Sequence, residues 1–316
     1  MSPFLITLGT VAVLLFVAAP GFLLIRRNMI SEACIPGISK ILLFVCQPCL
    51  AIYTFLSTES TAEKLAGIGV FSLLCLGIHA VILGSAFLVL RKKSAGQVIY
   101  RILTIGCAFG NCAFFGIPIL EALMPAAFSD VALYTTVYAL IMNVLGWTVG
   151  SAIIAHDLTY ISIRKILINP AMIGTAVAFL LFVLHAPIAE NLPNLFSMIT
   201  VVARMATPLS MLVMGMRLGT MDIGRLFSDW RIYLTIAVKQ FLMPLFAFGT
   251  ICALPIDLSL RQTFFVLCAC PAASIVLNFA EILGEGQKEA ANTVLLSTIL
   301  SILTLPVMML LFPFLS

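Results

Sequence analysis

Long apolar stretches separated by short polar loops make up nearly the whole chain. About 20 helical residues cross the ~30 Å hydrocarbon core of a bilayer, and each stretch reaches roughly that length. The pattern therefore predicts an all-α integral membrane protein with about ten transmembrane helices. We place these spans at residues 4–25, 38–56, 65–90, 102–124, 131–155, 168–186, 195–216, 232–253, 262–283 and 290–314.

The composition makes lipid the main solvent of this chain. Hydrophobic residues occupy 62% of the 316 positions and charged residues 9%, whereas a soluble domain has about a quarter of its residues charged. Cys46-x-x-Cys49 and Cys268-x-Cys270 have the spacing of metal or redox sites. Within apolar helices, however, such cysteines are more often small apolar fillers. We therefore expect no metal and no other cofactor.

Charged residues divide unequally between the two kinds of loop. Loops that follow odd-numbered spans contain basic residues, namely Arg26, Arg27, Arg91, Lys92, Lys93, Arg101, Arg164, Lys165, Arg217, Arg225, Arg231 and Lys288. The other loops contain only Lys64 and Arg261, together with acidic residues. The positive-inside rule then predicts a multi-pass protein of the cytoplasmic membrane with basic cytoplasmic loops and both termini outside. The net charge of +4 gives no reason to expect nucleic acid as a partner.

Five spans in each half would make the second half enter the membrane from the side opposite to the first. Such inverted repeats are the plan of many secondary transporters. Similar features recur about 150 to 160 residues apart, in the pairs Gln47-Pro48 and Thr207-Pro208, His79 and Lys239, and Gly116-Ile117-Pro118 and Cys270-Pro271. We therefore predict a 5+5 inverted repeat of residues 1–157 and 158–316.

The fourth and ninth spans contain helix-breaking residues near mid-membrane. Asn111, Gly116 and Pro118 lie in the fourth span, and Pro271, Ser274 and Asn278 lie in the ninth. If both helices are broken and cross, half-helix N-termini near Ile117 and Ala272 would offer unpaired amides and partial positive charge to an anion. The alternatives are two ordinary proline kinks and, for the asparagines, hydrogen bonds that only join helices.

Several ionisable residues fall inside predicted spans, where their burial is expensive and a role in function is the default hypothesis. Lys239 and Arg204 would either neutralise an anionic substrate or pair with a carboxylate. Glu121, Glu281 and His79 are candidates for proton coupling. Sodium coupling through backbone carbonyls and an uncoupled carrier remain open alternatives, and a lone histidine such as His79 is more often packed and hydrogen-bonded.

The fourth span resembles a motif of the auxin efflux carrier family, the bacterial permeases related to plant PIN-type exporters. The similarity lies in Gly110-Asn111 and the following Gly116-Ile117-Pro118-Ile119-Leu120. Lys239 with Pro244 in the eighth span, Pro271 with Phe279-Ala280 in the ninth, and Ser297-Thr298 with Thr304-Leu305-Pro306 in the tenth are also similar to the family. The resemblance covers essentially the whole chain.

This resemblance implies a crossover site at Asn111, Pro118 and Pro271. It also implies a scaffold of helices 1, 2, 6 and 7 and a transport part of helices 3–5 and 8–10, with elevator-type movement between the two. The resemblance further implies a homodimer, which we expect to form through helices 2 and 7. Family substrates include auxin and small dicarboxylates. Ala272-Ala273-Ser274 stands where family members vary, which leaves the substrate undetermined.

The combined expectation is a permease for a small organic anion such as a mono- or dicarboxylate. The alternative is a membrane sensor that binds a ligand without transporting it, although its cytoplasmic loops are too short for an output surface. An enzyme is not expected. The aspartates lie in loops, and neither a Gly-x-Ser-x-Gly motif nor a phosphate-binding glycine-rich loop occurs.

Overall fold

The computed structural model describes residues 1–161 and 170–315, and within these ranges the elements are helices, apart from one isolated β-bridge. Seven of the described helical runs are long and apolar enough to cross a membrane, namely Pro3–Arg26, Glu32–Leu56, Ala62–Ser94, Pro125–Ala155, Pro193–Thr220, Trp230–Cys252 and Gln287–Leu315. The shorter apolar helices are Cys112–Leu123, Met172–Val183, Leu258–Ala269 and Ser274–Leu283. These helices confirm the expectation of an all-helical membrane protein with several membrane-spanning segments. Arg164, Lys165 and the predicted start of the sixth span at Ile168 lie outside the described residues.

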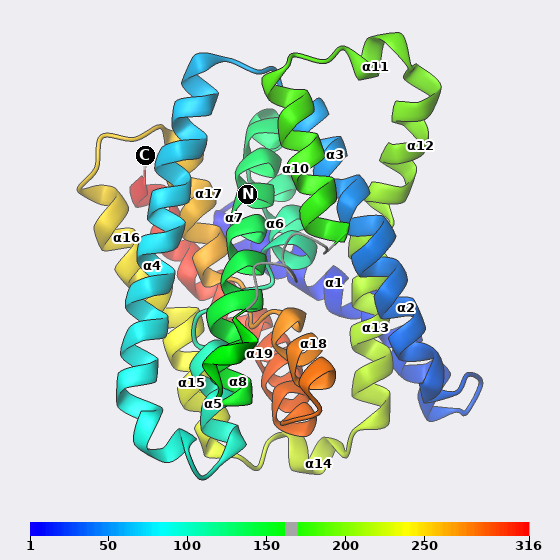
Figure 1. Cartoon of the computed structure of the whole chain (residues 1–316), viewed down its shortest axis with the longest axis vertical. Helices are drawn as coiled ribbons and strands as arrows, with labels where there is room; N and C mark the ends of the chain where they lie inside the picture. The colour runs from blue at the N-terminus through cyan, green and yellow to red at the C-terminus, as the bar shows by residue number, and fades with distance from the viewer. Residues whose placement is uncertain (162–169, 316) are drawn as a thin grey trace.

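The α-helices of the first half run at different angles to the long axis of the molecule in Figure 1. They are α1 (Pro3–Arg26), α2 (Ile35–Ile41), α3 (Gln47–Leu56), α4 (Ala62–Ser94), α5 (Val98–Gly106), α6 (Ile117–Leu123), α7 (Phe128–Leu145) and α8 (Ser151–Ala155). Those of the second half are α10 (Pro170–Val183), α11 (Ile188–Asn191), α12 (Pro193–Arg204), α13 (Ala206–Thr220), α14 (Ile223–Leu226), α15 (Trp230–Ala237), α16 (Met243–Cys252), α17 (Leu258–Ala269), α18 (Ser274–Leu283) and α19 (Gln287–Met308). Short 3-10 turns cover Glu32–Cys34, Pro125–Ala127, Leu158–Tyr160 and Met309–Leu315.

Three wide π-helical turns explain how proline-containing segments stay helical. The turns Leu42–Cys46, Cys112–Gly116 and Val238–Leu242 each end two residues before a proline, which is Pro48, Pro118 or Pro244. Proline lacks an amide hydrogen and its ring collides with the carbonyl of the preceding turn, so a locally wider turn relieves both problems. A fourth π turn, Gly146–Gly150, joins α7 to α8.

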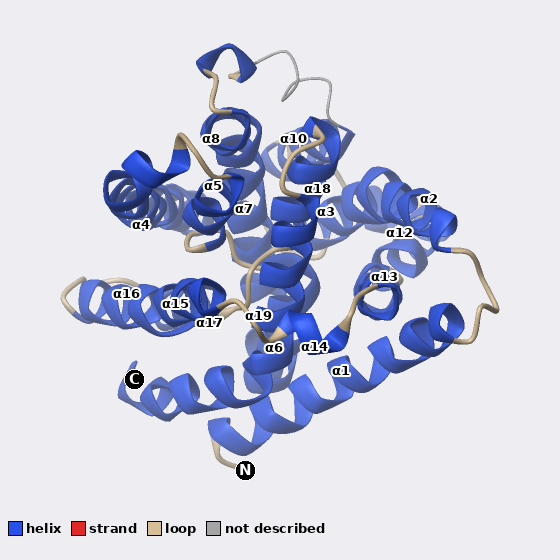
Figure 2. Cartoon of the chain, turned by 90° about the horizontal axis from the view of Figure 1, so that it is seen from below, coloured by secondary structure: helices blue, strands red, loops and turns tan. Residues whose placement is uncertain are grey.

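The helices form two groups around a central pair of interrupted segments. Helix α1 packs against α13, and α3 packs against both α10 and α12. On the other side, α4 packs against α5 and α7, and α16 packs against α17. Figure 2, in which the molecule is seen from below, shows α1, α2, α12 and α13 on one side and α4, α5, α15 and α16 on the other, with α18 and α19 between them.

Glycines let α1 and α13 pack so closely that their backbones are in contact. A Cβ on Gly215 would lie 1.8 Å from the carbonyl oxygen of Ala18, and a Cβ on Gly21 would lie 2.1 Å from that of Leu212. Gly219 follows Gly215 by four residues, on the same face of the helix, and also faces α1. Small residues at this spacing are typical of closely packed membrane helices.

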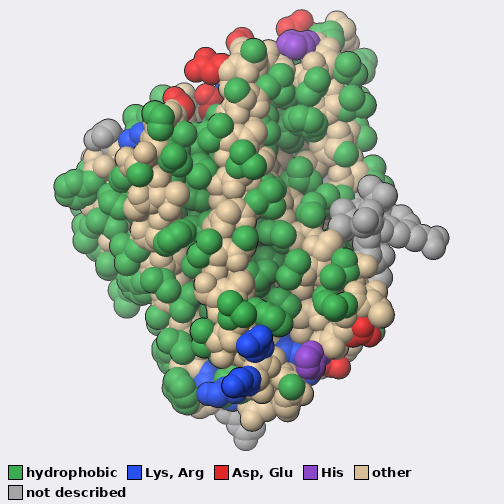
Figure 3. Space-filling model, turned by 60° about the vertical axis from the view of Figure 1, so that its left-hand side comes forward, with side chains coloured by type: hydrophobic (Ala, Val, Ile, Leu, Met, Phe, Trp, Pro, Cys, Tyr) green, Lys and Arg blue, Asp and Glu red, His purple; other side chains and the backbone are tan. Residues whose placement is uncertain are grey.

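Charged side chains gather at the two ends of the molecule. On the face shown in Figure 3, Asp and Glu side chains lie mainly at the upper end, Lys and Arg lie mainly at the lower end, and hydrophobic side chains cover the broad region between them. Helix α4 joins these ends, with Glu63 in its first turn and Arg91, Lys92 and Lys93 in its last. This distribution fits a multi-pass membrane protein with a basic and an acidic side.

Candidate functional site

Two segments that are far apart in the chain lose their helical structure at the same place. Helix α5 ends at Gly106, and the chain becomes helical again at Cys112. Helix α17 ends at Ala269, and α18 begins at Ser274. Both interruptions are surrounded by protein, because Phe109 and Cys270 are fully buried. Irregular backbone at membrane depth is tolerated only in such surroundings or beside a water-filled cavity.

The two interruptions satisfy each other's backbone groups. The amide of Asn111 donates to the carbonyl of Pro271 at 2.7 Å, and the amide of Ala273 donates to the carbonyl of Phe109 at 2.9 Å. These bonds form an antiparallel bridge between Gly110 and Ala272. We call this pair of interrupted segments, residues 107–111 and 270–273, the crossing.

Side chains from the neighbouring helices complete the crossing. The amide of Ala272 donates to the hydroxyl of Ser297 on α19 at 3.0 Å. The ammonium of Lys239, on the π turn between α15 and α16, donates to the carbonyl of Cys268 at 2.7 Å and is fully buried. Gly110 leaves room for that ammonium, since a Cβ at Gly110 would lie 2.9 Å from Lys239 Nζ.

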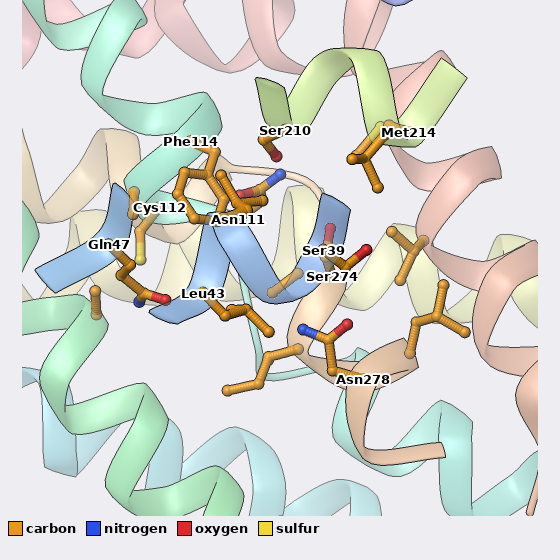
Figure 4. A pocket seen from close by; sticks show the side chains of 18 of the residues that line it. Ser39, Leu43, Gln47, Asn111, Cys112, Phe114, Ser210, Met214, Ser274 and Asn278 are labelled. Atoms are coloured by element: carbon orange, nitrogen blue, oxygen red, sulfur yellow. The ribbon is translucent and has the colours of Figure 1, made fainter. Parts of the chain in front are cut away.

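A pocket lies beside the crossing, between α2, α3 and α13 on one side and the interrupted segments on the other. The space open to a small solute is about 80 Å³, which is enough for a few water molecules or a small organic group. Figure 4 shows the side chains of Ser39, Gln47, Asn111, Ser274 and Asn278 among those that line this space. The polar residues of the lining are Ser39, Gln47, Asn111, Asn143, Ser210, Ser274 and Asn278.

Two buried polar atoms of the lining have no partner among the described residues. They are Nδ2 of Asn111, whose residue is 3% exposed, and Oε1 of Gln47. A buried donor without an acceptor costs about 1–3 kcal/mol. The amide of Asn111 therefore offers a hydrogen bond to a molecule in the pocket. Asn143 differs, because its Nδ2 already donates to the carbonyl of Ala139 at 2.8 Å on its own helix.

Arg217 is the one charged residue in the described lining of this pocket. Its guanidinium is paired with the carboxylate of Glu281 on α18 through both oxygens, and Nη2 also donates to Ser39 Oγ at 3.3 Å. The side chain of Arg217 is 15% exposed and that of Glu281 is 35% exposed. The ion pair therefore links α13 to α18 at the edge of the pocket.

Comparison with known protein families identifies the chain. A family model described as Mem_trans, membrane transport protein, matches residues 6–157 and 154–309. The chain belongs to this family of membrane transport proteins. The match confirms the resemblance to auxin efflux carrier-type permeases, and it is to a transporter family rather than an enzyme family. A search of curated proteins gave no match.

Some of the site residues predicted from the sequence line the pocket, and the others lie outside it. Asn111, Ser274 and Asn278 line the pocket. Gly116 and Pro271 are buried outside the described lining, where a Cβ on Gly116 would lie 2.7 Å from Leu267 Cδ2. Lys239 lies behind the crossing rather than in the pocket.

The position of the first break differs from the prediction. We expected a half-helix to begin near Ile117, but helical structure resumes at Cys112 and continues through Pro118 into α6. The wide turn before Pro118 absorbs the proline, so the break falls at the Gly110-Asn111 step instead. The second break lies at Pro271 as expected, and α18 begins at Ser274, two residues after the predicted start.

The three candidates for ion coupling are widely separated. Glu121, together with Pro118 and Arg204, lines a second pocket, which shares no described lining residue with the first. Glu281 binds Arg217. His79 is fully buried, and its Nδ1 donates to the carbonyl of Cys75 at 2.7 Å, while Nε2 has no described partner.

Sequence reasoning missed Arg217 and Gln47 as parts of the site. Arg217 was counted among the basic loop residues, because it follows the predicted seventh span directly, and Gln47 was used only as a mark of the repeat. Both lie on helices opposite the crossing. The available signals were a basic residue at the edge of one span and an amide residue in the middle of another, and neither says which helices face each other.

Proposed function

We propose that this membrane transport protein is a permease of the cytoplasmic membrane that moves a small organic anion, such as a mono- or dicarboxylate, by alternating access. The observation that carries the proposal is the buried, unpartnered amide of Asn111, a residue of the crossing that also lines the pocket, together with a described lining that has a positive charge and no negative one.

The backbone near the pocket favours the same class of ligand. The first amides of α18, those of Ser274 and Ile275, have no carbonyl acceptor within their own helix, as at every helix N-terminus. Both residues line the pocket. Partial positive charge at the start of a helix stabilises an anion. Lys239 adds a basic amine behind Gly110, where no carboxylate is paired with it in the described structure.

The proposed architecture is a ten-span 5+5 inverted repeat, with residues 1–157 and 158–316 as its halves. In this proposal the seven long apolar runs, the interrupted segments α5–α6 and α17–α18, and α10 would make the ten passes. Gln47-Pro48 and Thr207-Pro208, His79 and Lys239, and Glu121 and Glu281 are each separated by about 160 residues, which supports the repeat.

Movement would occur between two groups of helices. Spans 1, 2, 6 and 7 would form the scaffold, in which α1 and α13 are locked together at Gly21 and Gly215. Spans 3–5 and 8–10 would carry the crossing past it in an elevator-type step. Two separate pockets, one lined by Arg217 and one by Glu121, would give access from either face. Both termini would lie outside the cell, and two copies would pair through spans 2 and 7.

Reconstitution tests the function directly. Purified protein in liposomes is offered radiolabelled acetate, malonate or succinate under imposed pH, sodium and voltage gradients. The proposal predicts saturable uptake of at least one of these anions, and the gradient that drives it identifies the coupling ion. Absence of flux for all three anions would contradict the permease, and binding without flux would favour a sensor.

A further inference from the structure

The ion pair between Arg217 and Glu281 crosses between the two groups of helices. Arg217 lies in the last turn of α13, and Glu281 lies in the last turn of α18. The guanidinium donates through Nη1 and Nη2 to the two carboxylate oxygens, and Nη2 also reaches Ser39 on α2. A guanidinium fork opposite a carboxylate is the strongest form of this interaction in proteins.

The surroundings of the pair are asymmetric. Arg217 belongs to the described pocket lining, whereas Glu281 does not. The side chain of Arg217 is 15% exposed and that of Glu281 is 35% exposed. Glu281 can therefore turn toward water at low cost, while Arg217 needs an anion beside it, because an unpaired charge in a partly buried site is strongly unfavourable.

We propose that Arg217 is an anion-binding residue of the pocket, and that Glu281 is its internal ligand, which an entering carboxylate displaces. The inference rests on the proposed function for the chemical class of the ligand and does not require that the ligand be transported. In the exchange the guanidinium keeps two hydrogen bonds to a carboxylate throughout. Only the carboxylate changes, from that of Glu281 to that of the ligand.

The exchange would link occupancy of the pocket to movement. In the structure the pair ties α13 to α18. Once the ligand holds Arg217, that tie between α13 and α18 is broken. An anion would thus release one contact that holds the crossing against the helices opposite it. A neutral analogue of the same size would leave the contact intact.

The competing explanation is an ion pair that only holds two helices together. The two explanations predict opposite results for Glu281→Gln. If Glu281 competes with the ligand, removing its charge frees Arg217 and tightens binding. If the pair only joins helices, the variant is less stable and binding is unchanged or weaker.

Equilibrium binding of radiolabelled malonate to the full chain in lipid nanodiscs tests the proposal. We expect Glu281→Gln to bind malonate about tenfold more tightly and Arg217→Gln to bind it at least tenfold more weakly, as for loss of hydrogen bonds to a charged group. Arg217→Lys, which keeps the charge and loses the fork, should fall between Arg217→Gln and wild type. Arg231→Gln is the matched control, because it removes an arginine paired with Asp229 outside the pocket, and it should bind malonate like wild type.

The double variant Arg217→Glu with Glu281→Arg separates the explanations further. It restores an ion pair between the helices but removes the cation from its place in the lining. Recovery of wild-type binding in this variant would overturn the proposal, as would unchanged or weaker binding by Glu281→Gln. Glu281→Ala has the same expected result as Glu281→Gln and replaces it if that variant does not elute as a single folded species.

Different results would contradict the proposed role of Arg217 and the proposed permease function. If malonate binds as predicted in all variants but no anion crosses liposome membranes, the permease is wrong and the role of Arg217 stands. If anions are transported and Arg217→Gln leaves both binding and uptake unchanged, the permease stands and the role of Arg217 is wrong. If neither wild type nor Glu281→Gln binds malonate, Arg217 is not an anion site.

Discussion

The backbone amide of Asn111 donates a 2.7 Å hydrogen bond to the carbonyl of Pro271. This one contact joins the interruptions of two segments that lie in different halves of the chain. Asn111 also lines the pocket, and its side-chain Nδ2 has no described partner. The same residue thus closes the crossing through its backbone and carries the side-chain donor on which the proposed function depends.

Replacement of Asn111 tests that donor. We expect Asn111→Ala to weaken anion binding by about tenfold to a hundredfold, because a hydrogen bond to a charged group contributes about 1.5–3 kcal/mol. The backbone bond to Pro271 is retained, so thermal unfolding in detergent should change little. Asn292→Ala on α19, outside the described lining, is the control for loss of an asparagine. Wild-type uptake by Asn111→Ala would remove this amide from the mechanism.

Ser297 supports the crossing from α19. Its hydroxyl accepts the amide of Ala272 at 3.0 Å and donates to the carbonyl of Val294. Ser297→Ala leaves the buried amide of Ala272 without an acceptor, so we expect a loss of about 1–3 kcal/mol in the free energy of unfolding. Ser301→Ala is the matched control, because the hydroxyl of Ser301 bonds only a carbonyl of its own helix among the described residues. Equal destabilisation by both changes, measured by thermal unfolding, would contradict this role.

The charge of Lys239 is expected to act on the pocket from behind the crossing. Lys239→Met keeps most of the side-chain volume and removes the ammonium, so we expect anion affinity to fall about threefold to tenfold through loss of electrostatic attraction. Lys288→Met removes an exposed charge at the start of α19 and should change affinity little. Malonate titrations of the three proteins at one ionic strength provide the comparison. Equal affinities for wild type and Lys239→Met would show that this charge does not act on the ligand.

Because α1 and α13 are in close contact, we expect one added methyl group at this interface to destabilise the protein strongly. A Cβ at Gly215 would lie 1.8 Å from the carbonyl oxygen of Ala18, which is backbone and cannot turn away. Gly215→Ala should therefore force the helices apart and cost about 1–3 kcal/mol or more. Gly249→Ala, on α16, meets nothing within 4 Å and should be neutral or slightly stabilising. Thermal unfolding of the two variants side by side tests the contact.

The ion pair of Asp229 with Arg231 should make the stability of the protein depend on pH. Hydrogen bonds from the Arg231 side chain lower the pKa of Asp229 below its ordinary value. A carboxylate whose pKa is lower in the folded state stabilises the fold above its unfolded pKa of about 3.9, and this contribution is lost as the pH falls through the folded pKa. Asp229→Asn should therefore be less stable than wild type at pH 7, and the difference should shrink below about pH 4. A difference that stays constant down to pH 3 would contradict this explanation.

The sequence by itself determined that this is a helical membrane protein of the transporter family. Apolar stretches of about 20 residues with few charges leave lipid as the only adequate solvent, and the Asn111 to Leu120 motif indicated the family. The second interruption at Pro271 was also predictable, since a proline flanked by small residues has little to hold a helix together.

Only the tertiary structure decided where the first segment breaks and what faces the pocket. A π turn accommodates Pro118, so the break lies at Gly110-Asn111, where Gly110 leaves room for Lys239 from another helix. The pairing of Arg217 with Glu281 joins residues that are distant in the chain. In apolar helices the local sequence specifies length and interruptions, but almost any apolar face can pack against another. Which polar groups meet is therefore fixed by the packing of the whole molecule.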